Sequence, residues 1–198
     1  FKLSPSERRS AKVLEVGCGS GANLWMVARE GFQAHGIDIA ETGVKLCKEK
    51  LNQWGVSAKL KIANMKALPY EDGTFDVIYD VHSIQHNDLE GHRTTYREVF
   101  RCLKASGLFF QFHLGKKSYS HTNGGGVHLD QIAIDNVHNP SAPYSNDGLV
   151  SFLDPDIAEE LLSESGFIDI TIDSLLRYQQ HLDITTEYLS ITCRTPGE

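Results

Sequence analysis

Three glycines at alternate positions follow an apolar run near the start of the chain. Gly17, Gly19 and Gly21 stand directly behind residues 12–16, KVLEV, and Asp38 ends a second apolar run. A glycine turn lets the backbone approach a ligand without a Cβ in the way. A carboxylate about 20 residues further on can accept hydrogen bonds from both ribose hydroxyls of a nucleoside. Each feature alone also fits a tight turn or a helix cap, but together they are typical of nicotinamide dinucleotide sites and S-adenosylmethionine sites.

Glu15 separates these two cofactor classes. The segment GCGSGA fits the dinucleotide pattern G-x-G-x-x-A, so a nucleotide-dependent oxidoreductase stays an alternative. A carboxylate two residues before the first glycine would face a diphosphate unfavourably, whereas a cofactor with a sulfonium and an ammonium group would welcome it. The sequence therefore favours S-adenosylmethionine.

Candidate acid–base groups follow two later apolar runs. Asp80 ends residues 75–80, FDVIYD, with His82 and His86 behind it, and His113 ends residues 107–113, GLFFQFH. An oxygen or nitrogen that accepts a methyl group must lose a proton, and histidine is the usual base near neutral pH. We predict His82, His113 and Asp80 as catalytic residues, with Asp80 also bordering the cofactor. A structural role stays open for all three, and for His86 packing or helix capping is favoured.

Histidine spacing also raises the question of metal binding. His82 and His86 are four residues apart, and His121, His128 and His138 share one segment. Neither set has the carboxylate or cysteine companion that such sites usually include. No metal is predicted.

Runs rich in Val, Ile and Phe alternate with helical patterns along the chain. They predict strands over 12–16, 33–38, 58–63, 75–80 and 107–113, and helices over 21–30 and 41–54. A further helix would bury Tyr96, Val99, Phe100 and Leu103. This alternation predicts an α/β fold, a Rossmann-like doubly wound sheet with helices on both faces. Ligands bind at the carboxyl ends of the strands in such folds, where all the proposed site residues lie.

Residues 114–150 interrupt the alternation. HTNGGGVH and HNPSAPYSNDG carry turn residues and no sustained period. We interpret 1–198 as a single domain, with a substrate-side insertion or lid at about 114–150. A helix then begins at Asp154 and Pro155 and ends before Gly166. The runs IDITIDSLL and EYLSITCR predict a closing antiparallel pair.

Several motifs in order resemble those of the class I S-adenosylmethionine-dependent methyltransferases. VLEVGCGSG is similar to their first motif and GIDIA to their second, and NMKALPYEDGTFDVIYDVHSIQH and YREVFRCLKASGLFFQF resemble later ones. The resemblance covers about residues 11–112 and 152–194 and implies the strand order 3-2-1-4-5-7-6 with strand 7 antiparallel. It implies that the three glycines line the methionine part of the cofactor, that Glu15 lies near its amino group and that Asp38 holds the ribose. Cys18 and Ile39, within the same motifs, join the implied cofactor-binding residues, as do Asn64, where the family usually has Asp at the adenine, and Met65.

Composition limits the partners. The 198 residues carry 19 Lys and Arg against 26 Asp and Glu, a formal charge of −7, which argues against nucleic acid. No apolar run approaches a membrane span and no signal peptide core is present, so we expect a cytoplasmic protein, although an N-terminal segment could be missing. Cys18, Cys47, Cys102 and Cys193 are widely spaced, as in a reducing compartment.

The motifs of adenine, glutamine and protein arginine methyltransferases are absent, which leaves a small metabolite as the expected acceptor. A domain that binds the cofactor without turnover is a second alternative.

Overall fold

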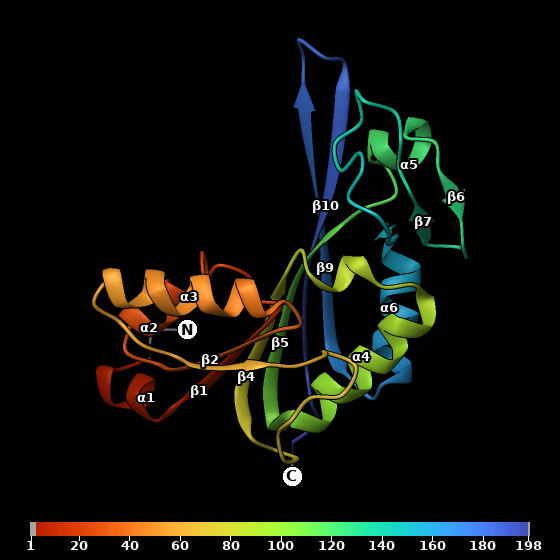
Figure 1. The fold of residues 1–198 in the computed structure, drawn as a ribbon. Helices are drawn as coiled ribbons and strands as arrows, with labels where there is room; N and C mark the ends of the chain where they lie inside the picture. Colours follow the sequence, from red (N-terminus) through yellow and green to blue (C-terminus); the bar gives the residue numbers. More distant parts are fainter. Residues whose placement is uncertain (1–2, 198) are drawn as a thin grey trace.

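A seven-stranded sheet forms the centre of the protein. The computed structural model describes residues 3–197, and its strand order is β3-β2-β1-β4-β5-β10-β9, with β10 antiparallel to both of its neighbours (Figure 1). This order confirms the predicted doubly wound sheet and its antiparallel closing strands. The strands are β1 (Lys12–Val16), β2 (Gln33–Asp38), β3 (Lys59–Ile62), β4 (Phe75–Val81), β5 (Leu103–Leu114), β9 (Ile168–Gln179) and β10 (Ile184–Arg194).

Helices cover the two faces of the sheet in different places. One apolar cluster joins β2 and β3 to α2 (Leu24–Arg29) and α3 (Glu41–Gln53), and α1 (Pro5–Ser10) contacts β2. The main cluster lies between the strands and α4 (Leu89–Cys102) and α6 (Pro155–Glu164), on the other side of the sheet (Figure 1). The carboxyl ends of β1, β2 and β4 therefore meet between the two helical layers.

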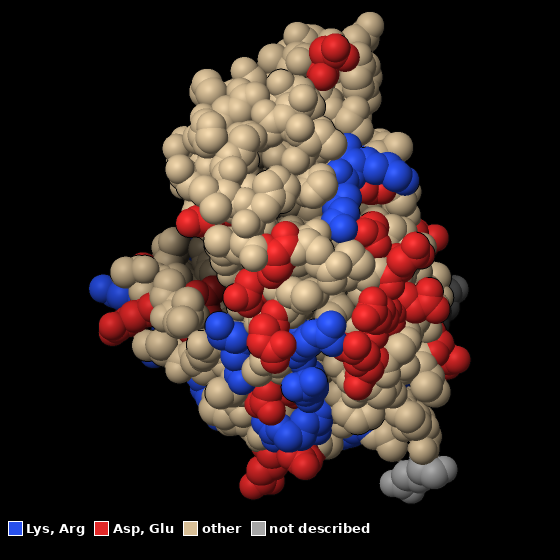
Figure 2. Space-filling model, turned by 90° about the vertical axis from the view of Figure 1, so that its right-hand side faces the viewer, with Lys and Arg blue, Asp and Glu red and all other residues tan. Residues whose placement is uncertain are grey.

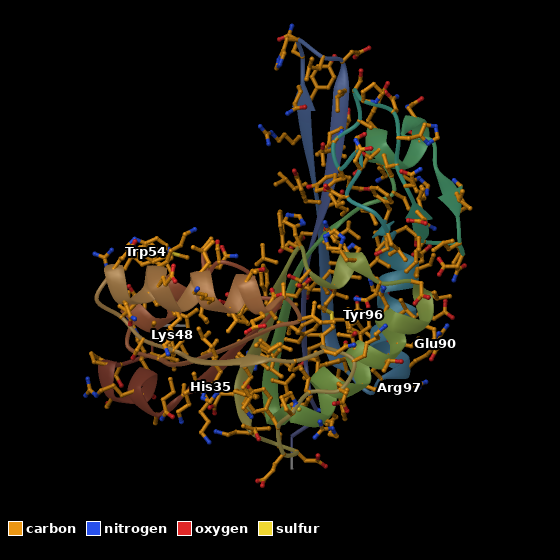
Figure 3. The ribbon with its side chains drawn as sticks, in the orientation of Figure 1. His35, Lys48, Trp54, Glu90, Tyr96 and Arg97 are labelled. Atoms are coloured by element: carbon orange, nitrogen blue, oxygen red, sulfur yellow. The ribbon has the colours of Figure 1, made fainter. Side chains whose placement is uncertain are left out.

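α4 shows how the sequence pattern sets this packing. The Asp88 side chain caps the helix by accepting a hydrogen bond from the Gly91 amide at 2.7 Å. Tyr96 is fully buried and donates a hydrogen bond to Gln111 of β5, whereas Glu90 and Arg97 point outward (Figure 3). The apolar periodicity of the segment is thus satisfied against the sheet.

Some predicted boundaries were wrong. The helix expected over 21–30 begins only at Leu24, because Gly21 has a φ of +79° and the chain is still turning. The fifth strand begins at Leu103 and not at Gly107, so Leu103 belongs to β5 and not to the preceding helix. The cap of α6 is confirmed: Asp154 accepts a hydrogen bond from the Ile157 amide, and Gly166 follows the helix with a φ of +98°.

The segment 114–150, which showed no sustained period, is regular in part. It contains α5 (Tyr119–Asn123), β6 (Val127–His128) and β7 (Ala133–Asp135), and β7 pairs with β8 (Val150–Ser151) in a second, three-stranded sheet. We call residues 115–153 the insertion. It has an apolar cluster of its own and packs beside β10. Residues 118–149 contain no Lys or Arg, and Figure 2 shows few charged side chains on this upper lobe.

Candidate functional site

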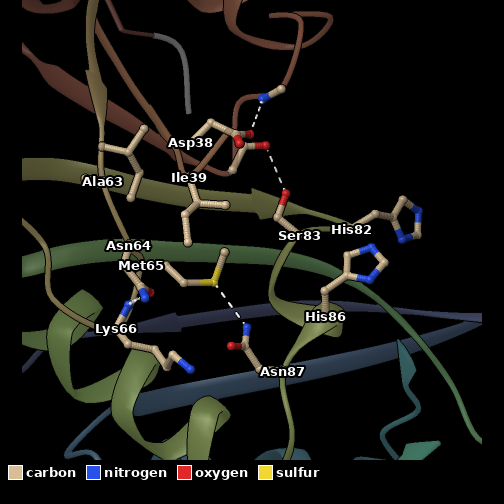
Figure 4. A pocket seen from close by; sticks show the side chains of 13 residues that line it. Asp38, Ile39, Ala63, Asn64, Met65, Lys66, His82, Ser83, His86 and Asn87 are labelled. Carbon is tan, nitrogen blue, oxygen red and sulfur yellow. Dashed lines mark hydrogen bonds between the residues drawn. The ribbon is translucent and has the colours of Figure 1, made fainter. Parts of the chain in front are cut away.

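A cavity of about 550 Å³ lies at the carboxyl ends of β1, β2 and β4 (Figure 4). Its walls come from the glycine turn, from the chain after β2 and β3, and from the turn after β4. This is the sheet edge at which the sequence placed the site. The lining residues are Gly17, Gly19, Ile37, Asp38, Ile39, Ala63, Asn64, Met65, Lys66, His82, Ser83, His86 and Asn87.

The glycine turn needs its glycines for different reasons. Gly17 has a φ of +70°, and a Cβ added there would lie 2.1 Å from Ser83 Oγ, which donates a hydrogen bond to the Gly17 carbonyl. Gly19 has a φ of +48°, and an added Cβ would have no neighbour within 4 Å. Gly17 therefore allows close packing against the turn after β4, while Gly19 leaves a bare stretch of backbone at the cavity.

Asp38 closes the cavity at the end of β2. Its Oδ2 accepts a hydrogen bond from the Gly19 amide and its Oδ1 accepts one from the Ala40 amide, both at 2.8 Å. The carboxylate thus fixes both the glycine turn and the backbone at Ala40, directly before α3. Because a carboxylate offers about four acceptor positions, it can still accept hydrogen bonds from a diol.

Glu15 lies behind the glycine turn and is 2% exposed. Asn23 Nδ2 donates a hydrogen bond to its Oε1 at 3.2 Å, whereas its Oε2 has no partner. Burial raises the pKa of Glu15 to about 7. A buried carboxylate oxygen without a partner suits a cationic group such as an ammonium.

Another wall of the cavity carries the residues that the resemblance implies to bind the adenine. Ile39 is 72% exposed and lines the cavity together with Asn64 and Met65. Asn64 Oδ1 accepts a hydrogen bond from the Lys66 amide at 2.9 Å, and Asn87 Nδ2 donates one to Met65 Sδ at 3.2 Å. The wall therefore combines apolar surface with an amide that retains donor and acceptor capacity.

His82 is the candidate base that the structure brings to the cavity. It has a φ of +64°, in the left-handed region that only a few non-glycine residues adopt, often at functional sites. Its Nδ1 lies 2.9 Å from Gln85 Oε1, and its ring contacts the rings of Phe112 and Tyr188. Burial lowers the pKa of His82 below its usual value, which favours the neutral ring.

The other two predicted catalytic residues do not line the cavity. His113 is fully buried, with its Nε2 3.1 Å from His92 Nε2 and its Nδ1 2.8 Å from the Leu114 carbonyl oxygen. Asp80 is also fully buried and accepts hydrogen bonds from the Ser83 and Ile84 amides at 2.9 and 3.1 Å. The expectation that both side chains border the methyl group is therefore corrected.

Burial changes the acid–base properties of both residues. Loss of water lowers the pKa of His113 well below its usual value and raises that of Asp80 to about 7. His113 belongs to a buried pair, and Asp80 caps the turn that carries His82. Glu15, Cys18 and Gly21 also lie outside the cavity lining. Cys18 and Gly21 contribute to the packing against Cys47.

Sequence reasoning missed six lining residues, Ile37, Ala63, Lys66, Ser83, His86 and Asn87. His86 was assigned a structural role, and its Nδ1 does bind the Leu149 carbonyl oxygen of the insertion, although the ring also lines the cavity (Figure 4). Ser83 stands between the two histidines in DVHSIQH, and this position could have identified it as a candidate site residue. Lys66 and Asn87 had no distinctive signal.

The histidines of the insertion lie together only in part. The His121 ring lies 6.1 Å from that of His128 and 5.4 Å from that of Phe152, measured between ring centroids. Between residues 3 and 197, no group of three or more His, Cys, Asp or Glu side chains is arranged to hold a metal ion. In the same range, no helix combines the length and the apolar composition that a membrane span needs.

These features fit S-adenosylmethionine. The bare glycine backbone and the Asp38 carboxylate line the cavity, and Glu15, with its unpartnered oxygen, lies outside the lining in the strand that leads into the glycine turn. The fold and this site together define a Rossmann-like methyltransferase domain.

Comparison with known proteins gives the same class. The family model described as "Methyltransferase domain" matches residues 13–107. Sterol 4-C-methyltransferase of Caenorhabditis elegans is 32% identical over 117 residues, 58% of this chain and 34% of that protein. Ajmaline N-methyltransferase of Rauvolfia serpentina is 32% identical over 104 residues, 51% of this chain and 35% of that protein. The matched segments thus span about a third of these two relatives.

A solved structure extends the likeness of fold to the whole chain. An S-adenosylmethionine-dependent methyltransferase of Methanosarcina mazei has a TM-score of 0.74 at 19% identity, with 100% of both chains covered. The family match over residues 13–107 and the curated relatives support a class I S-adenosylmethionine-dependent methyltransferase, and the solved structure shows the same fold.

Proposed function

We propose that this chain transfers the methyl group of S-adenosylmethionine to an oxygen or nitrogen atom of a small molecule, with His82 as the general base. The observation that carries the proposal is the position of His82, an imidazole in a left-handed backbone conformation at the edge of the cavity, where burial lowers its pKa. The bound cofactor supplies the electrophilic methyl group. The acceptor loses its proton to His82 as the new bond to carbon forms.

The remaining residues hold the cofactor. Asp38 would bind the ribose hydroxyls, Glu15 the amino group, and Asn64 the edge of the adenine, between Ile39 and Met65. The glycine turn would pass along the methionine part, since Gly19 leaves room there. The work of the protein is then to hold the acceptor in line with the methyl group at attack distance.

The acceptor is proposed from the character of the surroundings of His82. Phe112 and Tyr188 offer two aromatic rings beside it, 5.2 and 5.5 Å from its ring centroid, and these can pack on a flat or apolar part of a molecule. The relatives named above methylate carbon in one case and nitrogen in the other, according to their names. A base beside the cavity favours an acceptor that must lose a proton.

Two experiments test the proposal. Calorimetric titration with S-adenosylmethionine, S-adenosylhomocysteine and NADH should show binding of the two sulfur nucleosides alone. Turnover is then followed as S-adenosylhomocysteine released in the presence of pools of phenols, amines and enolisable compounds. With an accepted substrate, His82→Ala should lower kcat about 100-fold or more, while His128→Gln, at an exposed histidine of β6, should not. Full turnover by His82→Ala would remove the base, and turnover of carbon acceptors alone would correct the acceptor class.

A further inference from the structure

His82 is held in one orientation by groups on three elements. Phe112 of β5 and Tyr188 of β10 contact its ring, and these two rings stack on each other with centroids 5.1 Å apart. Gln85 of η1 (Ile84–His86) fixes the third side, with its Oε1 2.9 Å from His82 Nδ1. Gln85 is only 1% exposed, so this contact does not compete with bulk water.

We propose that Gln85 is the positioning residue of the base, since its amide oxygen accepts a hydrogen bond from His82 Nδ1–H and leaves His82 Nε2 as the proton acceptor. The inference rests on the proposed base role of His82. A neutral imidazole carries one proton on either nitrogen, and the hydrogen bond made by one nitrogen decides the state of the other. Without Gln85, the ring could carry its proton on Nε2, the wrong nitrogen for a base.

The backbone of Gln85 is itself fixed from two sides. Asp80 caps the turn by accepting hydrogen bonds from the Ser83 and Ile84 amides. Ser151 of β8 donates a hydrogen bond from its Oγ to the Gln85 carbonyl oxygen at 2.9 Å. Because Ser151 belongs to the insertion, docking of the insertion holds the residue that orients the base.

The uncharged amide also suits a base that must be free of its proton at neutral pH. A carboxylate at the same place would favour the imidazolium and raise its pKa, whereas an amide orients the ring without adding charge. The other titratable groups facing this ring are His86 of η1, His113 of β5 and Tyr188 of β10. None of these is a carboxylic acid.

The tautomer of His82 can be measured without knowing the acceptor. In the full chain labelled with ¹⁵N, two-bond correlation spectra of the imidazole nitrogens report which nitrogen of His82 is protonated, with His82→Ala serving for assignment. The wild type should show a protonated Nδ1 and a bare Nε2. Gln85→Leu should shift the population toward Nε2–H, and Gln131→Leu, at an exposed glutamine of the insertion, should leave it unchanged.

Gln85→Glu supplies the conservative variant. It should keep the proton on Nδ1 and raise the pKa of His82 by about one unit or more. With an accepted substrate, Gln85→Leu should lower kcat about 10- to 100-fold, part of the effect of a general base, with little change in KM. Gln85→Glu should retain kcat at high pH and lose it at a higher pH than the wild type on acidification.

Two results would overturn the positioning role. One is a wild-type His82 that carries its proton on Nε2, and the other is a tautomer that stays the same in Gln85→Leu while that variant remains folded in thermal unfolding. Failure of the proposed base role of His82 would give a different result from failure of the positioning role of Gln85. In that case the tautomer depends on Gln85 as stated, but His82→Ala turns over at the wild-type rate.

Discussion

Replacement of Asp38 by alanine tests the placement of the cofactor most directly. In the free protein the substitution removes two hydrogen bonds of 2.8 Å, from the Gly19 and Ala40 amides to the carboxylate. Hydrogen bonds to charged groups contribute about 1.5–3 kcal/mol each when buried, and Asp38 is partly exposed. We therefore expect the free energy of unfolding to fall by about 2–3 kcal/mol.

Asp38→Ala should also weaken cofactor binding directly, in addition to lowering the stability of the free protein. Two ribose hydroxyls would lose their acceptor, which at about 1.5 kcal/mol each amounts to about 3 kcal/mol, or a roughly 100-fold rise in Kd. Calorimetry with S-adenosylhomocysteine measures the affinity, and denaturant unfolding without ligand measures the stability.

Asp76→Ala is the matched control for this experiment. Asp76 Oδ2 accepts a hydrogen bond from the Lys12 amide at 2.8 Å, and its Oδ1 accepts one from Lys104 Nζ. It makes contacts of the same kind at the opposite ends of the strands, away from the cavity lining. This variant should lose stability and keep its affinity. If Asp38→Ala bound the nucleoside within about threefold of the wild type, the ribose placement would be refuted.

Three further substitutions test other parts of the site. Glu15→Gln should stabilise the free protein by up to about 3 kcal/mol at pH 8. A pKa raised from its usual value to about 7 makes the wild type lose stability as the pH rises from the usual glutamate pKa to about 7, and the loss is complete above 7. Urea unfolding at pH 5 and 8 checks this, and an equal difference at both would contradict it. Gly17→Ala should abolish cofactor binding by calorimetry, since its Cβ would overlap Ser83 Oγ, and Gly17→Ala with Ser83→Gly should recover part of the thermal stability. Glu187→Ala removes the buried acceptor of the Lys117 amide and should speed hydrogen exchange over residues 115–153, which an unchanged exchange map would disprove.

The sheet could be predicted because its strands carry strong local signals. β1 and β4 are short runs rich in branched apolar residues, and β2 ends at an acid. The strand order follows from the resemblance to a known family. The insertion could not be predicted in the same way. Strands of two or three residues, such as β6 and β8, are too short to show a period, and only tertiary packing selects them.

The errors among the site residues follow from strand geometry. In β5, Phe109, Gln111 and His113 share one face because side chains alternate, and that face lies under α4 and α6. We expected His113 at the cavity because it lies near the end of the strand. The alternation of side chains along β5 instead points it into the core. Asp80 shares a face with Ile78 in β4 for the same reason. His82 escapes this rule, since the strand ends at Val81 and the left-handed backbone redirects the side chain, a feature that no sequence pattern announces.

The turn after β4 joins parts of the site that the sequence presents separately. Ser83 packs against the glycine turn through its hydrogen bond to Gly17, and Gln85 contacts both the candidate base and the insertion. Asp80, which looked like an acid for catalysis, holds this turn together instead. A change at any of these positions should therefore alter cofactor binding and base orientation together. If His82 is the base, the buried Asp80 carboxylate would act on the chemistry without touching a substrate, because it holds the turn that carries His82 and Gln85.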